Sequence, residues 1–337
     1  MKTSFRYIAL MLIILVASCG FRMGSEEEIR SEEEIRLERA CRIDSTVLVS
    51  DSNDEGGQGR PRSPIECKDS LGDLTAEAWI LVEDSTGLLI SAKNPHKRMF
   101  MASLTKMMTC LLALENGNMG DTVVITQDVF LTKDSRVRPG DSYLLGNLIC
   151  EMMLQSDNNA ATALAKHIGG STEAFCDMMN AKAAYLGMDS THFANPNGMP
   201  NDSNYSSARD LVVLSRYCMA DSVFASIAGT PFMDIPLTDG RHLPCENTNL
   251  LLGQYEGCIG VKTGYTRQAG SCLAAAATRN GRRLFLILLN SRSRSSRFTE
   301  SAVLLDYGFW LIGKDESYVS EVQCAAKADG LSDYRQG

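Results

Sequence analysis

The chain has 337 residues, of which 44% are hydrophobic and 22% are charged, and this composition is typical of a globular protein. Its formal net charge of −8 argues against nucleic acid as a partner, because binding to phosphates needs a basic face. A chain of this length can bury a large hydrophobic core in one or two domains. The composition therefore favours a globular protein whose partners are not nucleic acids.

The first 19 residues have the pattern of a secretory signal peptide. Lys2 and Arg6 precede an apolar run over residues 8–17, which is too short for a comfortable membrane span. "VASC" at 16–19 resembles the cleavage box of a bacterial lipoprotein, in which the cysteine is lipidated and becomes the new N-terminus. We therefore predict that residues 1–19 are a lipoprotein-type signal, and that Cys19 anchors an exported, periplasmic protein to the membrane. An ordinary signal peptide or a short membrane anchor is the alternative.

Residues 20–72 are predicted to be a charged flexible tether rather than a domain. The stretch contains a direct duplication, "SEEEIR" at 25–30 and again at 31–36, which could form a short charged helix. It continues with "SDSNDEGGQGRPRSP" at 50–64, a composition typical of a linker. As a flexible coil, about 50 residues would span on the order of 40 Å, so an anchored domain could work above a membrane surface.

The globular part is predicted to run from residue 73 to 314 and to be followed by a polar tail at 315–337. Two strands are expected within 77–93, joined by a turn at Ser85-Thr86-Gly87. An apolar helix within 99–117 and a short strand at 121–126 come next. Further helices are expected, the last two with serine at their N-terminal caps. They lie at 144–155, 158–169, 171–187 and 207–219.

The pattern changes to strands in the last third of the chain. One strand is expected at 257–264, and two more within 270–290, where Asn280-Gly281 between two apolar runs predicts a tight hairpin. A helix at 299–312 closes the domain. Strands at both ends of the domain, with helices between them, predict an α+β fold with an antiparallel sheet faced by helices.

Ten cysteines follow Cys19, and export permits disulfide bonds. Five of them lie in apolar runs and are interpreted as small core residues. These are Cys110, Cys150, Cys176, Cys218 and Cys272. Cys245 with Cys258, and Cys41 with Cys67, are possible disulfide pairs that the sequence leaves open. No spacing of cysteine and histidine indicates a zinc site, and none of the four histidines is assigned a catalytic role.

At the start of the apolar helix, Lys106 follows Ser103 by three residues. Residues i and i+3 share a helix face, so the Lys106 amine can reach the Ser103 hydroxyl. A serine hydroxyl is a weak nucleophile until a base takes its proton, and Lys106 could be that base if burial and a second cation lowered its pKa. The Ser-x-x-Lys pattern alone is weak, because it is expected about once by chance in such a chain. A solvated lysine is the simpler interpretation of this pattern by itself.

Two further triplets change that balance. Ser156-Asp157-Asn158 lies at the break between two predicted helices, and Lys262-Thr263-Gly264 lies on a predicted edge strand. Each has a purely structural explanation, a helix N-cap for the first and a solvated strand end for the second. However, Ser-x-x-Lys, Ser-x-Asn and Lys-Thr-Gly each occur once in this chain, in the order found in penicillin-interacting serine enzymes. Their joint occurrence is much rarer than any one of them, so together they are a strong signal.

With these motifs the sequence resembles the D-alanyl-D-alanine carboxypeptidases, which are low-molecular-mass penicillin-binding proteins. The resemblance covers about residues 73–312. It includes the connecting text "ASLTKMMT", "GDSYLLGNLICEMMLQSDNNAATALA", "FANPNGM", "NTNLLLGQYEGCIGVKTGYT" and "AGSCLAAAATRNGRRLFLILLN". It implies a fold like that of β-lactamases and transpeptidases, in which a mostly helical subdomain accompanies the antiparallel sheet.

The resemblance also implies the reaction. Ser103 would attack the carbonyl between two D-alanines at the end of a peptidoglycan stem peptide, with Lys106 as the base. Ser156 would help to pass a proton to the leaving amine, and Asn158 would hold the substrate amide. We therefore predict Ser103, Lys106 and Ser156 as catalytic residues of a serine carboxypeptidase, with Asn158 binding substrate. β-Lactam antibiotics are expected to inhibit it by acylating Ser103.

The third motif would bind the terminal carboxylate of the substrate. Lys262 would supply positive field and Thr263 a hydrogen bond, and charge-assisted hydrogen bonds suit a carboxylate. Gly264 and Tyr265 are predicted to bind substrate as well, and the backbone N–H groups of the nucleophile and of Tyr265 to form the oxyanion hole. Lys262 is also the second cation expected to lower the pKa of Lys106. No metal or organic cofactor is expected.

The chain departs from this family at several places. Asp157 stands where the middle motif often has glycine, as in β-lactamases, and Met101 stands where proline often precedes the first motif. Many members carry a C-terminal β-domain and an anchor helix, whereas the chain after Lys262 is barely long enough to finish the catalytic domain. The lipid on Cys19 is therefore expected to provide the anchor. Arg297 could add to carboxylate binding, or could equally be a solvated arginine.

Two other functions remain open. A class A-like β-lactamase shares the three motifs but also needs a Glu-x-x-Leu-Asn loop to activate the deacylating water. None of the three glutamates between Ser156 and Lys262 begins that pattern, and "FANPNGM" stands where the loop is expected. The other alternative is a non-catalytic peptidoglycan-binding lipoprotein, although binding alone needs no nucleophile and base. Endopeptidase action on cross-links would use the same Ser103 chemistry.

Overall fold

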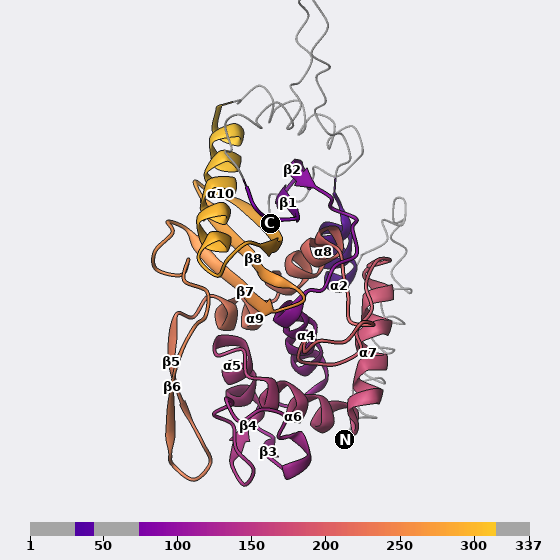
Figure 1. Ribbon diagram of the computed structural model, residues 1–337, viewed down its shortest axis with the longest axis vertical. Helices are drawn as coiled ribbons and strands as arrows, with labels where there is room; N and C mark the ends of the chain where they lie inside the picture. Colours follow the sequence, from indigo (N-terminus) through magenta and orange to yellow (C-terminus); the bar gives the residue numbers. More distant parts are fainter. Residues whose placement is uncertain (1–30, 44–73, 315–337) are drawn as a thin grey trace, which may run out of the picture. The chain divides into compact units, whose positions relative to one another are not determined.

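The computed structural model describes residues 31–43 and 74–314 (Figure 1). The predicted signal with Cys19, most of the expected tether and the expected tail at 315–337 lie outside the described residues. The statements that follow concern the described part of the chain.

A five-stranded antiparallel sheet, in the order β2-β1-β9-β8-β7, is the frame of the domain. Its strands are β1 (Ala78–Glu83), β2 (Leu89–Lys93), β7 (Cys258–Thr266), β8 (Gly270–Arg279) and β9 (Arg282–Ser291). Pairing of β1 with β9 joins the two ends of the domain in one sheet. Asn280 and Gly281 both have positive φ, as a tight turn between β8 and β9 requires, so the predicted hairpin is confirmed.

Both faces of the sheet are buried, because alternate residues of a strand point to opposite sides. On β8, Ala274 and Ala276 belong to one hydrophobic cluster, whereas Leu273 and Ala275 belong to another. The first cluster includes residues from most of the helices. The second lies between the sheet and α10 (Ser296–Lys314), which covers that face in Figure 1. Burial on both sides explains why β9 reads as a continuous apolar run, "LFLILL", rather than as an alternating one.

The helices between the first and last strands make up a mostly helical part of the domain, as predicted. They are η2 (Ala102–Thr105), α4 (Lys106–Asn116), η3 (Gln127–Val129), α5 (Leu145–Leu154), α6 (Asn158–Gly169), α7 (Thr172–Tyr185), α8 (Ala208–Met219) and α9 (Ser222–Ala228). Ser171 and Ser207 cap α7 and α8 with their side chains. The turns η2 and η3 and the short helix α9 were not predicted. The predicted α+β class is confirmed.

Two short hairpins lie outside the main sheet. β3 (Thr122–Val124) pairs with β4 (Ser142–Leu144), and β5 (Phe232–Pro236) pairs with β6 (His242–Glu246). Only β3 was predicted from the sequence. The β5–β6 pair was missed because each strand contains a proline, which weakens the sequence signal of a strand.

The cysteines of the described residues are all free thiols. The five predicted core cysteines are buried, as expected. Cys245 and Cys258, left open as a pair, do not form a disulfide; the Cys245 thiol instead donates a hydrogen bond to the Glu151 carboxylate. Cys41 is also unpaired, and Cys67 lies outside the described residues.

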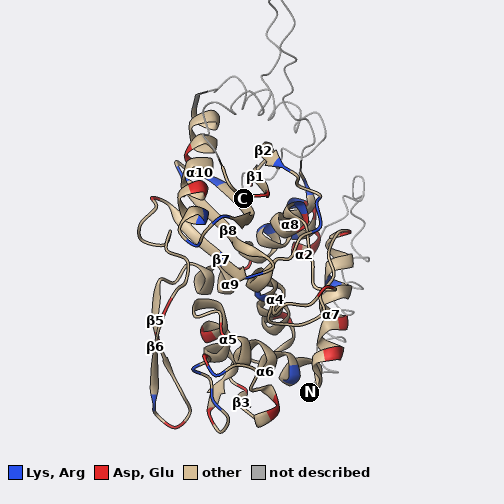
Figure 2. Ribbon diagram, viewed as in Figure 1, with Lys and Arg blue, Asp and Glu red and all other residues tan. Residues whose placement is uncertain are grey.

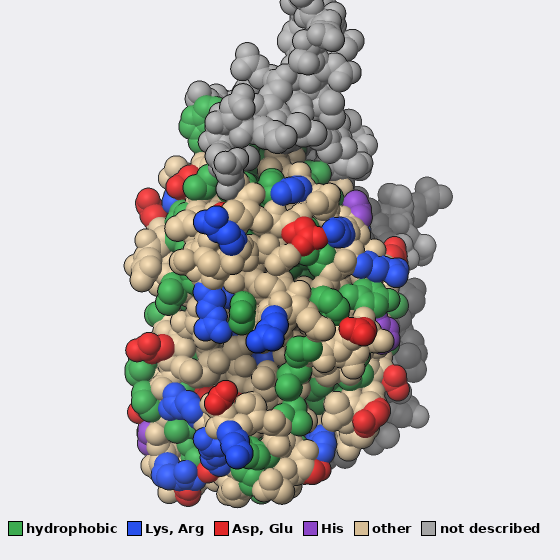
Figure 3. All heavy atoms as spheres, viewed as in Figure 1, with side chains coloured by type: hydrophobic (Ala, Val, Ile, Leu, Met, Phe, Trp, Pro, Cys, Tyr) green, Lys and Arg blue, Asp and Glu red, His purple; other side chains and the backbone are tan. Residues whose placement is uncertain are grey.

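Charged side chains occur on many elements of the domain (Figure 2). On the face seen in Figure 3, lysines and arginines are interspersed with aspartates and glutamates. That face therefore shows no continuous basic stripe of the kind that binds nucleic acid. None of the described helices taken singly is long and apolar enough to cross a membrane, and α8 and α9 qualify only as a pair bent by 110°.

Helix α2 (Glu32–Cys41) lies within the stretch expected to be a flexible tether. From Arg36 onward, the chain packs against the main domain. Ala40 is buried, and Leu37, Cys41 and Ile43 contact the larger hydrophobic cluster. The expectation of a flexible tether therefore does not hold for residues 36–43. Leu37, Ala40 and Cys41 form a narrow apolar stripe at helical spacing, which the surrounding charges obscured in the sequence.

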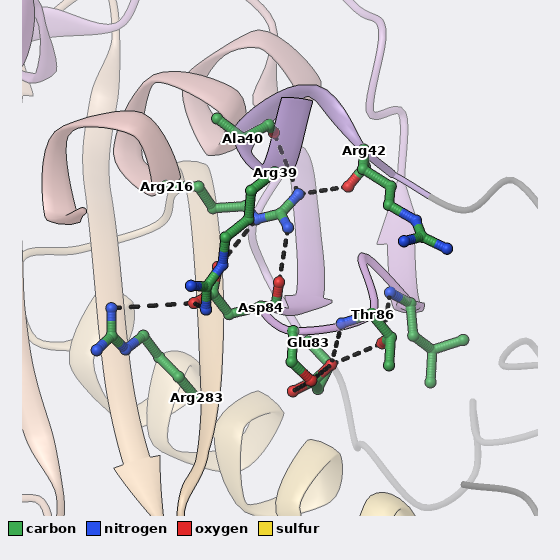
Figure 4. Close-up of polar contacts among 10 residues, drawn as sticks. Arg39, Ala40, Arg42, Glu83, Asp84, Thr86, Arg216 and Arg283 are labelled. Carbon is green, nitrogen blue, oxygen red and sulfur yellow. Dashed lines mark hydrogen bonds and ion pairs between the residues drawn. The ribbon is translucent and has the colours of Figure 1, made fainter. Parts of the chain in front are cut away.

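A buried arginine, Arg216 of α8, holds the end of α2 in place (Figure 4). Its guanidinium donates to the carbonyl oxygens of Ala40, at 3.1 Å, and of Arg42. It also donates to the Asp84 carbonyl at 2.8 Å, and its Nε lies 3.3 Å from Asp84 Oδ1. Arg39 pairs with the other carboxylate oxygen of Asp84. Because carbonyls at a helix C-terminus lack partners within the helix, Arg216 caps α2 while it pairs with Asp84.

We predict that Arg216→Met lowers the free energy of unfolding by about 3 kcal/mol, because it leaves Asp84 and the α2 carbonyls without their buried donor. Urea denaturation of the full-length protein measures this. Arg283→Met is the matched control, since Arg283 reaches the same carboxylate only at 3.9 Å and is 37% exposed. Equal losses from the two substitutions would show that Arg216 does not dock α2.

Candidate active site

Ser103 and Lys106 lie at the junction of two kinds of helix. Ser103 is in the 3-10 turn η2, and Lys106 is the first residue of α4. Lys106 Nζ lies 2.9 Å from Ser103 Oγ. Ser103 is half-buried, whereas Lys106 is completely buried. The spacing of three residues thus brings the predicted base into hydrogen-bond contact with the predicted nucleophile.

The Lys106 amine is surrounded by neutral oxygen atoms. Besides Ser103 Oγ, it donates to Asn158 Oδ1 at 2.7 Å and to the Asn197 carbonyl. Burial lowers the pKa of Lys106 to about 7, while the negative charge of nearby Asp157 acts in the opposite direction. A lysine with this pKa is partly neutral at pH 7, and the neutral amine is the form that can accept a proton from a serine.

Two glycines contact the peptide bond that precedes the nucleophile. A Cβ atom on Gly198 would lie 2.0 Å from the Ala102 carbonyl oxygen, and one on Gly264 would lie 3.1 Å from the Ser103 nitrogen. Ala102 has a φ of +48°, which is uncommon for a residue with a side chain. The strained turn that presents Ser103 is therefore held by close backbone contacts from two separate segments. A side chain is excluded at Gly198, and a Cβ at Gly264 would make a tight contact that the turn must yield to accommodate.

The second motif lies at the break between α5 and α6, as predicted. Ser156 has a φ of +62°, and Asp157 is the N-cap of α6 and accepts a hydrogen bond from Ala160 N. Asn158 is the first residue of α6 and reaches Lys106. The Ser156 hydroxyl has no hydrogen-bond partner within the residues that the structure describes. Its role in proton transfer stays a prediction.

The third motif lies on β7, which is an edge strand as predicted. Lys262 is buried, and its Nζ donates to the Thr263 carbonyl at 3.2 Å. Thr263 is also buried, and its Oγ1 lies 2.6 Å from Thr248 Oγ1. Tyr265 is 48% exposed, with the Arg294 guanidinium 4.5 Å from its ring centroid. One strand thus presents a buried amine, a buried hydroxyl and an exposed aromatic ring.

Arg297 adds a buried guanidinium beside this strand. It is 7% exposed and donates to the Gly264 carbonyl at 3.0 Å, so its interpretation as a solvated arginine is wrong. Burial lowers the pKa of Lys262, and repulsion from Lys106 and Arg297 lowers it further. Burial is the larger cause of the lowered pKa of Lys106, and the repulsion between the two lysines disfavours the charged form of both.

The sequence analysis missed the residues that hold the motifs in place. Asn197 and Gly198 lie in "FANPNGM", and the Pro196 carbonyl in that loop accepts a hydrogen bond from Thr109 Oγ1 of α4 at 2.6 Å. Thr248 lies in the loop before β7. Asparagine, proline and glycine together indicate a turn at 195–198. That signal does not say which part of the molecule the turn approaches.

The arrangement joins a serine hydroxyl, a lysine amine that is partly neutral near pH 7, and an edge strand whose buried lysine lies near a buried arginine. This set suits acyl transfer on a substrate with an anionic end. Among residues 31–43 and 74–314, no group of three or more His, Cys, Asp or Glu side chains could hold a metal ion. The expectation that no cofactor takes part stays a prediction.

Comparison with known proteins decides the family. The model of the D-alanyl-D-alanine carboxypeptidase family matches residues 65–293. The chain belongs to this family. It is therefore a serine-type peptidase of the penicillin-binding class, as the three motifs predicted.

Relatives and solved structures agree with this assignment. A D-alanyl-D-alanine carboxypeptidase of Mycobacterium tuberculosis is 37% identical over 250 residues, which cover 72% of this chain and 84% of that protein. One of Bacillus subtilis is 32% identical over 241 residues, but the chain spans only 62% of that longer protein. The crystal structure of the Streptomyces K15 DD-transpeptidase matches with a TM-score of 0.67 at 31% identity, over 71% of this chain and 98% of that one. The predicted transpeptidase-like fold is confirmed.

We predict that Gly264→Ala slows acylation of Ser103 by benzylpenicillin by at least about tenfold without unfolding the protein. The added methyl group would press on the Ala102–Ser103 peptide, and small displacements of a nucleophile cost large factors in rate. The measurement is the rate at which the drug adduct appears by mass spectrometry. Gly146→Ala is the control, because its Cβ would meet only ordinary contacts at 3.5 Å or more. Equal rates for both variants would contradict a tight fit at Gly264.

Proposed function

We propose that this protein removes the terminal D-alanine from peptidoglycan stem peptides through an acyl-enzyme on Ser103. The observation that carries the proposal is the contact between Lys106 Nζ and Ser103 Oγ, made by a buried amine whose pKa is lowered to about 7. The activity is a proposal for the whole protein, because several relatives are considerably longer than the matched region.

In the first step, neutral Lys106 takes the proton of Ser103 while Oγ attacks the carbonyl carbon between the two D-alanines. The resulting oxyanion is held by the backbone N–H groups of Ser103 and Tyr265. Ser156 helps to pass a proton to the amine of the last D-alanine as its C–N bond breaks. Water then hydrolyses the ester on Ser103 and restores the free hydroxyl.

The substrate's terminal carboxylate binds to the third motif. The anionic end of the substrate favours the charged form of Lys262 against the burial that lowers its pKa, and Thr263 and Gly264 lie beside it on the edge strand β7. Arg297 adds positive field through its contact with the Gly264 carbonyl. Asn158 Oδ1 accepts a hydrogen bond from Lys106 Nζ, so the Nδ2 group of Asn158 remains to donate to the substrate amide.

The contacts of Lys106 disfavour a β-lactamase. A class A-like β-lactamase needs a glutamate to activate the deacylating water. In this chain the loop "FANPNGM" stands where that glutamate is expected. It contributes the Asn197 carbonyl oxygen, which accepts a hydrogen bond from Lys106 and cannot serve as a base near neutral pH. A penicilloyl ester on Ser103 should therefore persist. The direct contact between Ser103 and Lys106 likewise disfavours a protein that only binds peptidoglycan.

We also propose that lipid on Cys19 holds this enzyme on a membrane in the periplasm, where its substrate lies. The support is the apolar run that ends in "VASC", a sequence that resembles a lipoprotein cleavage box. Residues 36–43 are packed on the domain, so the free part of any tether ends before Arg36 rather than near residue 72. A tether that ends at Arg36 has a shorter reach than one that ends at residue 72, so the enzyme would be held closer to the membrane.

The function is tested by intact mass after brief exposure of the full-length protein to benzylpenicillin, with Ser103→Ala beside it. We expect a lasting adduct of one drug molecule on the native protein and none on the variant. Rapid loss of penicillin without a lasting adduct would indicate a β-lactamase instead. Neither adduct nor drug loss from folded protein would leave only the binding lipoprotein.

The anchor is tested by Cys19→Ala, expressed in a bacterium with its own lipoprotein machinery. We expect the native protein to sediment with membranes and to incorporate labelled fatty acid, and the variant to lose the label. Label retained by the Cys19→Ala variant would refute lipidation at this residue.

A further inference from the structure

Asp157, which stands where this family often has glycine, uses both carboxylate oxygens in the structure. Oδ1 accepts a hydrogen bond from Ala160 N at 2.9 Å and so caps α6. Oδ2 accepts from Ser135 Oγ at 2.6 Å and from Arg136 N at 3.3 Å. The side chain is buried, with 7% of the residue exposed. One carboxylate thus joins the first turn of α6 to the loop at 131–137.

Asn159 holds the same loop from the same turn of α6. Its Oδ1 accepts from the backbone N–H groups of Leu131, at 2.9 Å, and of Thr132, at 3.3 Å. Its Nδ2 donates to the Val137 carbonyl at 3.1 Å. The loop is therefore attached near both of its ends to the residues that flank Asn158.

Asn158, between these two residues, faces the other way and accepts the hydrogen bond from Lys106. The start of α6 is consequently fixed on one side by the loop and engages the base on the other. The negative charge of Asp157 also acts on Lys106. Further titratable groups in this region are Lys262 on β7, Arg297 on α10 and Glu151 on α5; burial disfavours the charged form of each.

We propose that Asp157 is a positioning residue for the general base. Its carboxylate fixes the start of α6 so that Asn158 meets the Lys106 amine, and its charge stabilises the ammonium ion that forms when that amine takes the proton of Ser103. The proton moves from Ser103 Oγ to Lys106 Nζ. A glycine at this position has no side chain, so it could neither hold the loop nor supply a negative charge. This inference rests on the proposed function and refines it.

The sign of the pH effect follows from the charge. Lys106 must be neutral to act as a base, so acylation slows as the pH falls through its pKa. Asp157 raises the pKa of Lys106 against the larger effect of burial. Removing that charge should therefore let the enzyme stay active at lower pH, while the less stabilised ammonium ion should make the maximal rate smaller.

The experiment compares full-length native protein with Asp157→Asn, which keeps the shape and an acceptor for Ala160 N. The readout is the rate of Ser103 acylation by benzylpenicillin on both sides of neutral pH. At acid pH the acylation rate falls, and we call this fall the acid limb of the profile. We expect its midpoint in Asp157→Asn to lie about one pH unit below that of the native protein. The maximal rate should be reduced by about tenfold. If Asp157→Asn does not fold, Asp157→Ser, which keeps an N-cap hydroxyl, carries the same test.

Asp221→Asn is the matched control. Asp221 caps α9 by accepting from Val223 N and Phe224 N, so the substitution removes the same charge from the same kind of cap without any contact to Lys106. Its acid limb should coincide with that of the native protein. An unshifted acid limb in Asp157→Asn, even at a reduced rate, would overturn the proposal and leave Asp157 as a structural cap. Absence of an adduct on the native protein would instead refute the proposed function.

Discussion

The amine of Lys106 lies buried among three neutral oxygen atoms, and the chemistry of the site follows from that placement. An ammonium ion removed from water without a counter-ion costs several kcal/mol, and proteins commonly respond by lowering the pKa until the group is neutral. Here burial brings the pKa of Lys106 to about 7. A residue that would otherwise be a fixed positive charge becomes a base in hydrogen-bond contact with Ser103.

The rest of the domain supplies the surroundings that this lysine requires. Asn158 reaches it from the first turn of α6, and the Asn197 carbonyl reaches it from a loop tied to α4. The edge strand β7 closes the other side, where Gly264 comes against the turn that carries Ser103. These segments are distant in the sequence, and the antiparallel sheet and the helices on its face bring them together. A small backbone shift in any of them would alter the solvation of Lys106, and through it the nucleophile.

The fold class, the main strands and helices, and three motifs that the structure brings together were predictable from the sequence, because they depend on local patterns and on a characteristic order of short motifs. Sequence reasoning missed what depends on tertiary contact. Asn197 acts through a backbone carbonyl, which has no side-chain signature. The docking of α2 depends on Arg216, whose partners Ala40, Arg42 and Asp84 lie far from it in the sequence. The buried state of Arg297 was equally invisible, since its neighbours in "SRSRSSRF" are those of a surface segment.

The ionisation of Lys106 in the free protein can be measured directly, and it decides whether this amine can act as the base. Carbon-13 labelling of lysine, with Lys106→Arg to assign the signal, would give the pH at which the amine loses its proton. We expect a midpoint near 7, well below the ordinary value for a lysine. A midpoint near the ordinary lysine value of about 10.4 would contradict this expectation, because Lys106 would then be charged at neutral pH and could not take the proton of Ser103.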